Sequence, residues 1–526
     1  MTPAAAEVRL TWVQPEDLVG HELRQAQEDG RDASEVRRRW LSAGGRPAPA
    51  RAGASPGPTD PALRALAERL LDELAGLPSP LAADEPTGLP AIHALAPAWP
   101  AVACGPVAAA SPAVHGAGRA AASADGPAGQ ADTPAGTAVR TAAGRARTGP
   151  PGAGRDRSRP GGASGALAAR LEAAWLGRAA GCVLGKPVEK LTLEGIRQIA
   201  RSTGNWPLDG WFTQTGLDPD VAARHPWNRR SAGTSLAENI DGTPEDDDLN
   251  YPLLGLLLLE SHGHGFGTAD VARLWLAELP AGRTFTAERV AYRNLLDGVE
   301  PPRTATLRNP FREWIGALIR ADVHGLTHPG DPVAAADQAW RDAVLTHTAN
   351  GVYGAMFAAA VIAAAAGGGA DVHGCLAAGL DVVPSRSRLA RAVRFGVDAA
   401  RAEPTGTAEG FADVVDALHA AYGDHHWVHI LPNASLLAAA LTHADGDFSG
   451  SITRAVSGGW DTDSNGATAG SVAGLLAGSP AALPARWTGP LKNRLSTSVG
   501  GLDGIGFDTL ARRTAALAVL PQEGSS

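Results

Sequence analysis

Cysteine is scarce in this chain. The 526 residues include three cysteines, Cys104, Cys182 and Cys375, which lie far apart, are odd in number and form no Cys-x-x-Cys pair. A disulfide framework needs paired cysteines in an oxidising compartment, so the sequence excludes the class of small disulfide-stabilised secreted domains. We therefore expect a protein of the reducing cytoplasm.

Long hydrophobic runs are also missing. The longest, Val352–Ala366, is mostly alanine and is shorter than the roughly 20 residues that a membrane-spanning helix needs. The first residues, MTPAAAEVRL, lack the basic region followed by an apolar segment that marks a signal peptide. A formal net charge of −9 gives no reason to expect a polyanion-binding surface. We expect neither membrane insertion nor nucleic-acid binding.

The chain does contain helical periodicity, with no alternation of strand and helix patterns. Apolar residues recur at spacings of three and four, which is typical of helices that bury one face. The sequence therefore predicts an all-α protein. Its helices are expected at residues 15–29, 32–40, 60–76, 167–183, 249–262, 268–279, 286–297, 331–343, 352–366, 370–383, 387–400, 407–422 and 430–441.

Composition divides the chain into three parts. Residues 1–46 are predicted to be an N-terminal helical extension docked on the main body, in which Asp32 and Glu35 resemble a capping box. Residues 47–165 are predicted to be a low-complexity linker with one short helix at 60–76. From residue 77 onward, the linker has too few large apolar residues to offset ordering entropy, so we expect disorder. Residues 166–526 are the predicted folded body.

The stretch Ala455–Gly478, AVSGGWDTDSNGATAGSVAGLLAG, carries two carboxylates before a run of small residues. Asp461 and Asp463 lie two apart, where oxygen ligands could converge on a hard cation at a helix start. Glycine recurs every four residues at Gly466, Gly470, Gly474 and Gly478, so one helix face lacks side chains and predicts close packing. By itself, the acidic pair could equally be an N-cap on a buried helix.

A second acidic stretch, Thr243–Tyr251, places Glu245, Asp246, Asp247 and Asp248 in a row before the apolar segment Leu253–Leu259. The helix dipole stabilises acids at a helix start by about 0.3–1 kcal/mol each, which justifies one or two of them. Four beside a core segment are better explained by cations that neutralise them, and Mg²⁺ and Mn²⁺ prefer such oxygen ligands. Alone, the run could also be a solvated acidic turn.

Four motifs resemble the ADP-ribosylglycohydrolase family, which includes the enzyme that reactivates ADP-ribosylated dinitrogenase reductase. They are Gly177–Glu189 (GRAAGCVLGKPVE), the Asp246-Asp247 pair at a helix start, His347 in THTANGVYGAMFAAA, and GGWDTDSN. They stand in the family's order, and the resemblance extends from about Leu167 to the C-terminus. It implies an all-α orthogonal multi-helix bundle with two Mg²⁺ or Mn²⁺ ions in a central cleft.

The resemblance also implies an activity, which is hydrolysis of the glycosidic bond of an ADP-ribosyl or related ribosyl conjugate. The expected partner is an ADP-ribosylated protein or a small ADP-ribosyl conjugate. Glu189, Asp247 and Asp461 are the catalytic candidates. The implied metal ligands are Asp246, Asp247, Asp461, Asp463 and Ser464, with Glu245 and Asp248 beside them, and the implied substrate contacts are His347, Asn350, Gly351, Arg320 and Trp460.

The sequence departs from the family pattern at the metal ligands. The first motif of the family usually reads hydroxyl-Asp-Asp-Thr, whereas Glu245 and Asp248 flank the aspartates here, and Ser464 stands where threonine is common. These changes leave the exact ligand set and the substrate linkage open. A non-catalytic structural or ADP-ribose-binding member of the same fold is the alternative function.

Several residues admit two interpretations. His347 could contact substrate or be a core or capping histidine, and Arg320 could bind a phosphate or form a structural ion pair. Trp206, Trp211 and Trp227 lie in a segment without clear period, where they could line a pocket or plug the fold. For His425, His426 and His429, whose spacing matches no standard zinc site, we expect a loop cluster.

Overall fold

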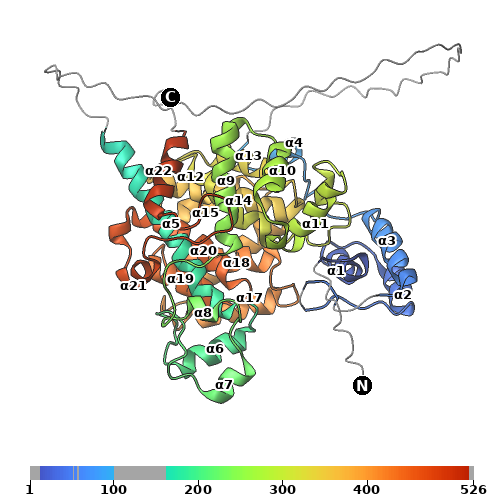
Figure 1. Cartoon of the computed structure of the whole chain (residues 1–526), viewed down its shortest axis with the longest axis horizontal. Coiled ribbons are helices and arrows are strands. Elements are labelled where there is room, and N and C mark those ends of the chain that lie inside the picture. Colours follow the sequence, from blue (N-terminus) through green and yellow to red (C-terminus); the bar gives the residue numbers. More distant parts are fainter. Residues whose placement is uncertain (1–11, 51, 56–58, 100–160, 520–526) are drawn as a thin grey trace, which may run out of the picture. The chain divides into compact units, whose positions relative to one another are not determined.

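The computed structural model describes residues 12–50, 52–55, 59–99 and 161–519 (Figure 1). Within these ranges the chain forms α-helices, short 3-10 helices and isolated bridges, but no β-strand, so the all-α prediction is confirmed. The helices are α1 (Pro15–Glu28), α2 (Ser34–Ser42), α3 (Pro61–Ala75), α4 (Leu89–Leu95), α5 (Gly161–Gly185), α6 (Leu193–Ser202), α7 (Pro219–Arg224), α8 (Ala232–Ser235), α9 (Asp247–His262), α10 (Thr268–Glu278), α11 (Thr286–Leu296), α12 (Asp322–Leu326), α13 (Pro332–Ala343), α14 (Ala349–Gly367), α15 (Val372–Asp381), α16 (Arg388–Ala402), α17 (Phe411–Tyr422), α18 (Ile430–His443), α19 (Phe448–Ser457), α20 (Thr462–Ala477), α21 (Ala485–Thr488) and α22 (Phe507–Leu517).

Helices α5 and α20 pack against each other at backbone contact, and this pair positions the acidic residues (Figure 1). A Cβ atom on Gly181 would lie 1.8 Å from the carbonyl oxygen of Gly466, and one on Gly470 would lie 2.0 Å from that of Gly177. No side chain fits at these positions, so the predicted packing face of α20 is confirmed. Gly478 does not share it, because it ends the helix with a φ of 84°, a conformation that favours glycine.

Helix α14 forms part of the buried core. Nearly all of its residues between Asn350 and Ala366 are buried, in agreement with its alanine-rich sequence. Among the described residues, this one helix is long and apolar enough to cross a membrane by length and composition, but 89% of its apolar window is buried within the protein. Burial of this kind is what the core helix of a globular fold requires.

The N-terminal helices contact the body through buried ion pairs. Glu22 of α1 accepts hydrogen bonds from Arg312, with an Nη1–Oε2 distance of 2.8 Å, and also pairs with Arg31. Arg308 of the body pairs with Asp72 of α3 at 2.8 Å, where both side chains are partly exposed. Helices α1 and α3 match their predicted positions closely, whereas α2 begins at Ser34, without the predicted Asp32–Glu35 capping box.

The prediction of disorder from residue 77 onward is wrong for residues 77–99. Glu85 is buried and pairs with Arg388 at 2.7 Å, and Thr87 accepts a hydrogen bond from the Trp340 indole nitrogen at 2.8 Å. Helix α4 follows at Leu89. Hydrogen bonds and charges hold this segment, whereas the prediction counted only apolar residues. Of the rest of the predicted disordered linker, residues 100–160 lie outside the described residues, and residues 161–165 form the start of α5, where the prediction is also wrong.

The histidines of residues 425–429 lie in a loop that faces α1. The His426 ring stacks on Trp314 at 4.2 Å and lies 6.1 Å from the His21 ring, centroid to centroid. Burial, helped by the nearby charge of Arg24, lowers the pKa of His21 and of His426 to about 3. Within the described ranges these histidines do not form a group with metal-ligand spacing, so they remain a loop cluster, as expected.

Candidate metal centre

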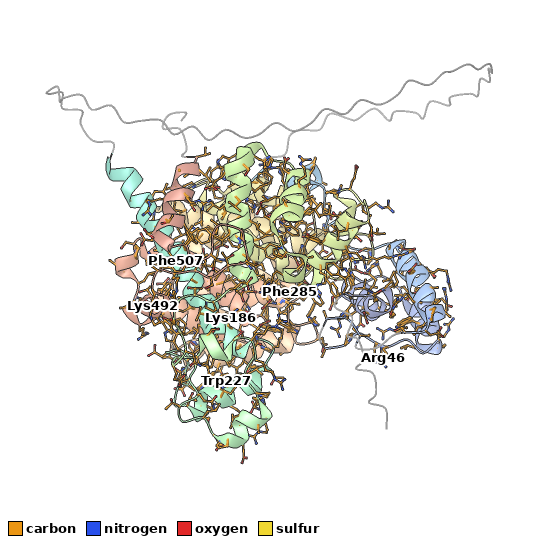
Figure 2. All side chains as sticks on the ribbon, in the orientation of Figure 1. Arg46, Lys186, Trp227, Phe285, Lys492 and Phe507 are labelled. Carbon is orange, nitrogen blue, oxygen red and sulfur yellow. The ribbon has the colours of Figure 1, made fainter. Side chains whose placement is uncertain are left out.

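The acidic run at residues 245–248 becomes the start of α9. Asp246 is the N-cap, and its Oδ1 accepts a hydrogen bond from the Asp248 backbone nitrogen at 3.0 Å. Lys186, which directly follows α5 (Figure 2), forms an ion pair with the other oxygen of Asp246 and donates to the Glu245 carbonyl oxygen at 3.3 Å. Burial alone would raise the pKa of Asp246, but the adjacent Lys186 ammonium outweighs it and lowers this pKa.

The second acidic pair lies at the start of α20. Asp461 is the N-cap, and its backbone nitrogen donates to Asn433 Oδ1 at 3.1 Å. The Thr462 hydroxyl donates to the Gly185 carbonyl oxygen at 2.8 Å, so this turn is fixed to the end of α5. Asp463 follows within the first turn, and both aspartate side chains are buried. The glycine contact between α5 and α20 thus places Asp461 and Asp463 beside the residues that follow α5.

The two helix starts meet in space. Ser464 Oγ on α20 donates a hydrogen bond to Asp248 Oδ2 on α9 at 3.3 Å. Burial, followed by repulsion from Glu189 and Asp246, raises the pKa of Asp463 to about 7. Burial and the negative charges of Asp246 and Asp463 likewise raise the pKa values of Asp247 and Asp248 well above their usual range. Acids from both stretches therefore share one buried, electrostatically coupled site.

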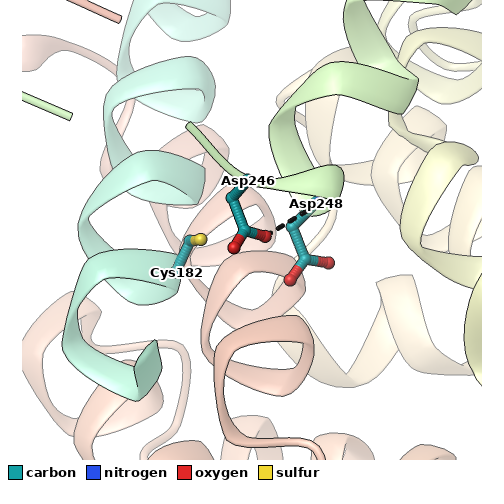
Figure 3. Close-up of side chains that lie close together, drawn as sticks. All are labelled: Cys182, Asp246 and Asp248. Carbon is teal, nitrogen blue, oxygen red and sulfur yellow. Dashed lines mark hydrogen bonds between the residues drawn. The ribbon is translucent and has the colours of Figure 1, made fainter. Parts of the chain in front are cut away.

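A compact group of possible metal ligands lies at the α9 side of this site. The Cys182 sulfur and one carboxylate oxygen each from Asp246 and Asp248 lie within 4.8 Å of one another, and all three residues are buried (Figure 3). Oδ1 of Asp248 has no hydrogen-bond donor among the described residues. The site holds buried acids that repel one another and a carboxylate oxygen that lacks a donor. Both features are consistent with binding of a divalent cation, which would supply the missing positive charge.

Glu189 lies at the edge of the acidic site. Its Oε2 accepts a hydrogen bond from Asn228 Nδ2 at 2.7 Å, and its other oxygen pairs with Lys190. Its negative charge helps to raise the pKa of both Asp461 and Asp463, so the carboxylate lies close to them. The structure therefore brings Glu189 together with the predicted metal ligands.

Glu245 does not join the other acids. Its Oε2 forms an ion pair with Arg283 at 2.7 Å, and its Oε1 accepts a hydrogen bond from Asn250 at 3.3 Å. These contacts do not support its predicted role as a metal ligand, which stays a prediction. As the residue before the N-cap of α9, Glu245 points to a different neighbour than the aspartates that follow it.

Arg320 and His347, two of the predicted substrate contacts, lie in a buried polar network. Arg320 pairs with Asp342 at 2.9 Å and with Glu288 at 3.1 Å, contacts that favour the structural reading of this arginine. His347 is buried, its Nδ1 lies 2.6 Å from Thr346 Oγ1, and burial lowers its pKa well below the usual value. His347 is thus a buried core histidine, and the substrate role predicted for both residues stays a prediction that these contacts do not support.

Side chains of residues 85 and 87 contact the start of α14. The Asn350 amide donates to Glu85 at 2.8 Å, and the Ala349 backbone nitrogen donates to Thr87 Oγ1 at 3.0 Å. A Cβ atom on Gly351 would lie 2.4 Å from the Arg312 carbonyl oxygen, so the backbone of residue 312 packs directly against this glycine. These contacts do not support the predicted substrate contacts of Asn350 and Gly351, which stay a prediction.

The aromatic residues have structural contacts. Trp460 stacks on His419 with ring centroids 3.8 Å apart and is 6% exposed, so the structure gives its predicted substrate contact little free surface. Trp211 packs edge-on against Trp487, and its indole nitrogen donates to the Arg486 carbonyl oxygen at 2.8 Å. Of the two readings of the tryptophan segment, these contacts favour a structural role for Trp211.

Sequence reasoning missed the side chains of α5 that face the acids. Arg178, Cys182 and Lys186 recur every four residues, in parallel with the glycines at 177, 181 and 185. Arg178 donates to the Asp248 carbonyl oxygen at 2.7 Å and pairs with Asp322 at 2.8 Å. The period of four was the available signal, because residues at this spacing share one helix face.

Three comparisons with known proteins were made. A family model described as ADP-ribosylglycohydrolase matches residues 163–522. A solved structure titled "ADP-ribosylglycohydrolase-related protein complex" is similar to this chain at 19% sequence identity and a TM-score of 0.43, and the match covers 68% of this chain and 100% of the other. A search of curated proteins finds no match.

Proposed function

The chain belongs to the ADP-ribosylglycohydrolase family, and on this premise we propose that it is a metal-dependent hydrolase. It would cleave the glycosidic bond of an ADP-ribosyl or related ribosyl conjugate. The observation that supports this proposal is the convergence of acids from the starts of α9 and α20 in one buried site, where burial and neighbouring carboxylates raise the pKa values of Asp247, Asp248 and Asp463. Isolated helix caps would not need such a cluster.

The proposed cofactor is a pair of divalent cations, Mg²⁺ or Mn²⁺. Asp246, Asp247, Asp461, Asp463 and Ser464 would hold them, and Asp248 joins this set because its Oδ1 lacks a donor. When bound, such cations would polarise ribose oxygens and activate a water molecule. Lys186 already neutralises Asp246, so the protein itself supplies part of the positive charge that the site requires.

The remaining steps belong to side chains of the site. Glu189 lies close to Asp461 and Asp463, and we propose that its carboxylate moves a proton to or from the attacking water or leaving group. Asn228 and Lys190 would hold Glu189 in place through the contacts described above. Asp247 and Asp461 would stabilise the positive charge that develops at the anomeric carbon during cleavage.

The proposed substrate is an ADP-ribosylated protein or a small ADP-ribosyl conjugate, in the cytoplasm. Purified full-length protein would be incubated with ADP-ribosyl-arginine, ADP-ribosyl-serine and free nucleosides, with Mg²⁺ or Mn²⁺, and the released products measured by chromatography. We expect cleavage of one ADP-ribosyl conjugate and its loss in Asp461→Ala. Absence of cleavage for every substrate, together with absence of metal binding, would contradict the proposal and favour the non-catalytic alternative.

A further inference from the structure

Cys182 has no part in the proposed reaction, yet its thiol lies within the acidic site. Its sulfur and oxygens of Asp246 and Asp248 lie within 4.8 Å of one another (Figure 3). Three ligands of one ion at bond lengths of about 2.0–2.3 Å are separated by roughly 3–4 Å. Small side-chain rotations would therefore bring these three atoms onto a single cation.

The position of Cys182 is fixed by the backbone around it. Gly181, the preceding residue, touches the Gly466 backbone so closely that α5 cannot rotate about its axis without a clash. Cys182 is fully buried and lies one helical turn from Lys186, which contacts Asp246, and one from Arg178, which contacts Asp248. The thiol is thus held between the two cationic residues of α5, facing the start of α9.

Asp248 provides an independent indication of a missing ligand. Its side chain is 2% exposed, and its Oδ1 accepts no hydrogen bond from any described residue. The Arg178 guanidinium stands 3.7 Å from this oxygen, beyond hydrogen-bond distance. A buried acceptor without a donor is unfavourable, and a bound cation would satisfy it.

We propose that the Cys182 thiolate, together with Asp246 and Asp248, is a ligand of a divalent transition-metal ion. Soft thiolate ligands favour Zn²⁺ and Co²⁺, whereas Mg²⁺ prefers oxygen alone, so this position prefers Zn²⁺ or Co²⁺ to Mg²⁺. On binding, the thiol proton leaves to bulk water and a sulfur–metal bond replaces the sulfur–hydrogen bond. The inference rests on the proposed metal-dependent function and specifies one of its ions.

Cobalt tests this directly, because a thiolate bound to Co²⁺ gives a near-ultraviolet charge-transfer band. Full-length protein freed of metal by a chelator would be titrated with Co²⁺ without oxygen, with absorption and calorimetry followed together. We expect the band to appear with Co²⁺ binding, to persist in the Cys104→Ser/Cys375→Ser double variant, and to disappear in Cys182→Ser and Cys182→Ala. Circular dichroism and thermal unfolding would confirm that each variant is folded.

The affinities for Zn²⁺ and for Mg²⁺ provide the second readout. Cys182→Ser should lose at least about tenfold in Zn²⁺ affinity, because loss of even an outer-shell partner typically costs 10–100-fold. Its Mg²⁺ affinity should change much less. Co²⁺ binding without the band, or an unchanged ratio of Zn²⁺ to Mg²⁺ affinity in Cys182→Ser, would overturn the thiolate ligand but leave the proposed hydrolase intact. Absence of binding for every divalent ion would contradict both.

Discussion

Lys186 is the side chain that most directly offsets the charge of the acidic site. Its ammonium is buried beside Asp246, whereas Asp247, Asp461 and Asp463 have raised pKa values because they are buried among like charges. In the absence of metal, protons and the neighbouring cationic side chains Lys186, Lys190 and Arg178 must limit the repulsion. A residue that supplies fixed positive charge at such a position contributes to stability as well as to cation binding.

We therefore expect Lys186→Met to destabilise the metal-free protein by about 3–5 kcal/mol, the usual effect of removing one partner of a buried ion pair. Lys492→Met is the matched control, because Lys492 pairs with Asp241 where both side chains are more than half exposed. This control should lose at most about 1 kcal/mol. Urea unfolding in the presence of a chelator measures both. Equal losses would show that Lys186 is not an important charge partner.

His21 gives a pH dependence whose sign follows from its environment. Burial lowers its pKa from 6.5 to about 3, so the folded protein binds fewer protons there than the unfolded chain. This histidine's contribution is fully present above pH 6.5 and falls by about 1.4 kcal/mol per pH unit as the pH decreases toward 3. Glu28, whose pKa is raised to about 8 by burial and by Glu313, contributes with the opposite sign.

A comparison with His21→Leu isolates this effect, because Glu28 remains in both proteins. Between pH 7.5 and pH 5, the variant should lose about 2 kcal/mol less unfolding free energy than the wild type. Denaturant unfolding at the two pH values measures the difference. Identical losses would mean that His21 is already protonated in the folded state at pH 5.

The acidic residues of the site could be predicted from the sequence, whereas the partners of the charged side chains could not. Asp246, Asp247, Asp461 and Asp463 stood out because carboxylates clustered before apolar helices need a reason. The departure of Glu245 toward Arg283 and the burial of Arg320 with Asp342 depend on side-chain directions and distant neighbours. A single sequence shows neither.

At the scale of elements, the contact between α5 and α20 determines the site. Both helices carry glycine at successive turns, so that carbonyl oxygens of one helix contact the Cα atoms of the other. Each glycine disfavours an isolated helix by about 1 kcal/mol, which close packing must offset. The α5 residues 178, 182 and 186 can face the start of α9 only because this contact fixes the rotation of α5.

Gly181→Ala should therefore be strongly destabilising, by more than about 3 kcal/mol, because its Cβ would clash with the Gly466 carbonyl backbone at 1.8 Å. Gly165→Ala in the same helix is the matched control, since nothing lies within 4 Å of its added Cβ. This control should be neutral or stabilised by up to about 1 kcal/mol. Thermal and urea unfolding test both variants. Similar stabilities would contradict backbone contact between α5 and α20.

Strongly periodic helices were predictable, and irregular ones were not. The expected helix at 286–297 corresponds to α11 (Thr286–Leu296), because its pattern and its boundaries are local. Helix α19 (Phe448–Ser457) was not predicted, since Gly450 and three serines lower its intrinsic helix propensity, and packing against α20 overrides this. The predicted capping box at Asp32 was wrong because the N-cap of α2 is Ala33. Asp32 lies before it and accepts a hydrogen bond from the backbone nitrogen of Ser34, the first residue of the helix.

At the scale of the whole molecule, the N-terminal segments are part of the folded body. Glu85 pairs with Arg388, which also contacts Glu313, and the Tyr353 hydroxyl of α14 donates to the Pro86 carbonyl oxygen. These buried contacts cover the start of α14, where the family resemblance implied substrate contacts. Composition could not predict this, since a few polar side chains hold an otherwise low-complexity segment.

Glu85→Gln should lower the unfolding free energy of the full-length protein by about 3 kcal/mol, the lower end for a buried pair because Glu313 still pairs with Arg388. Asp72→Asn is the control. It removes a partly exposed pair between α3 and Arg308 and should lose at most about 1 kcal/mol. Urea unfolding compares them, and a Glu85 effect no larger than that of Asp72 would show that residues 77–99 contribute little.

Anomalous diffraction from crystals grown with Mn²⁺ tests most directly whether the two acidic helix starts form one metal centre. The account predicts anomalous density within bonding distance of carboxylate oxygens from both residues 246–248 and residues 461–463. Density bound to only one of these stretches, or no density at a Mn²⁺ concentration that saturates binding in solution, would contradict it.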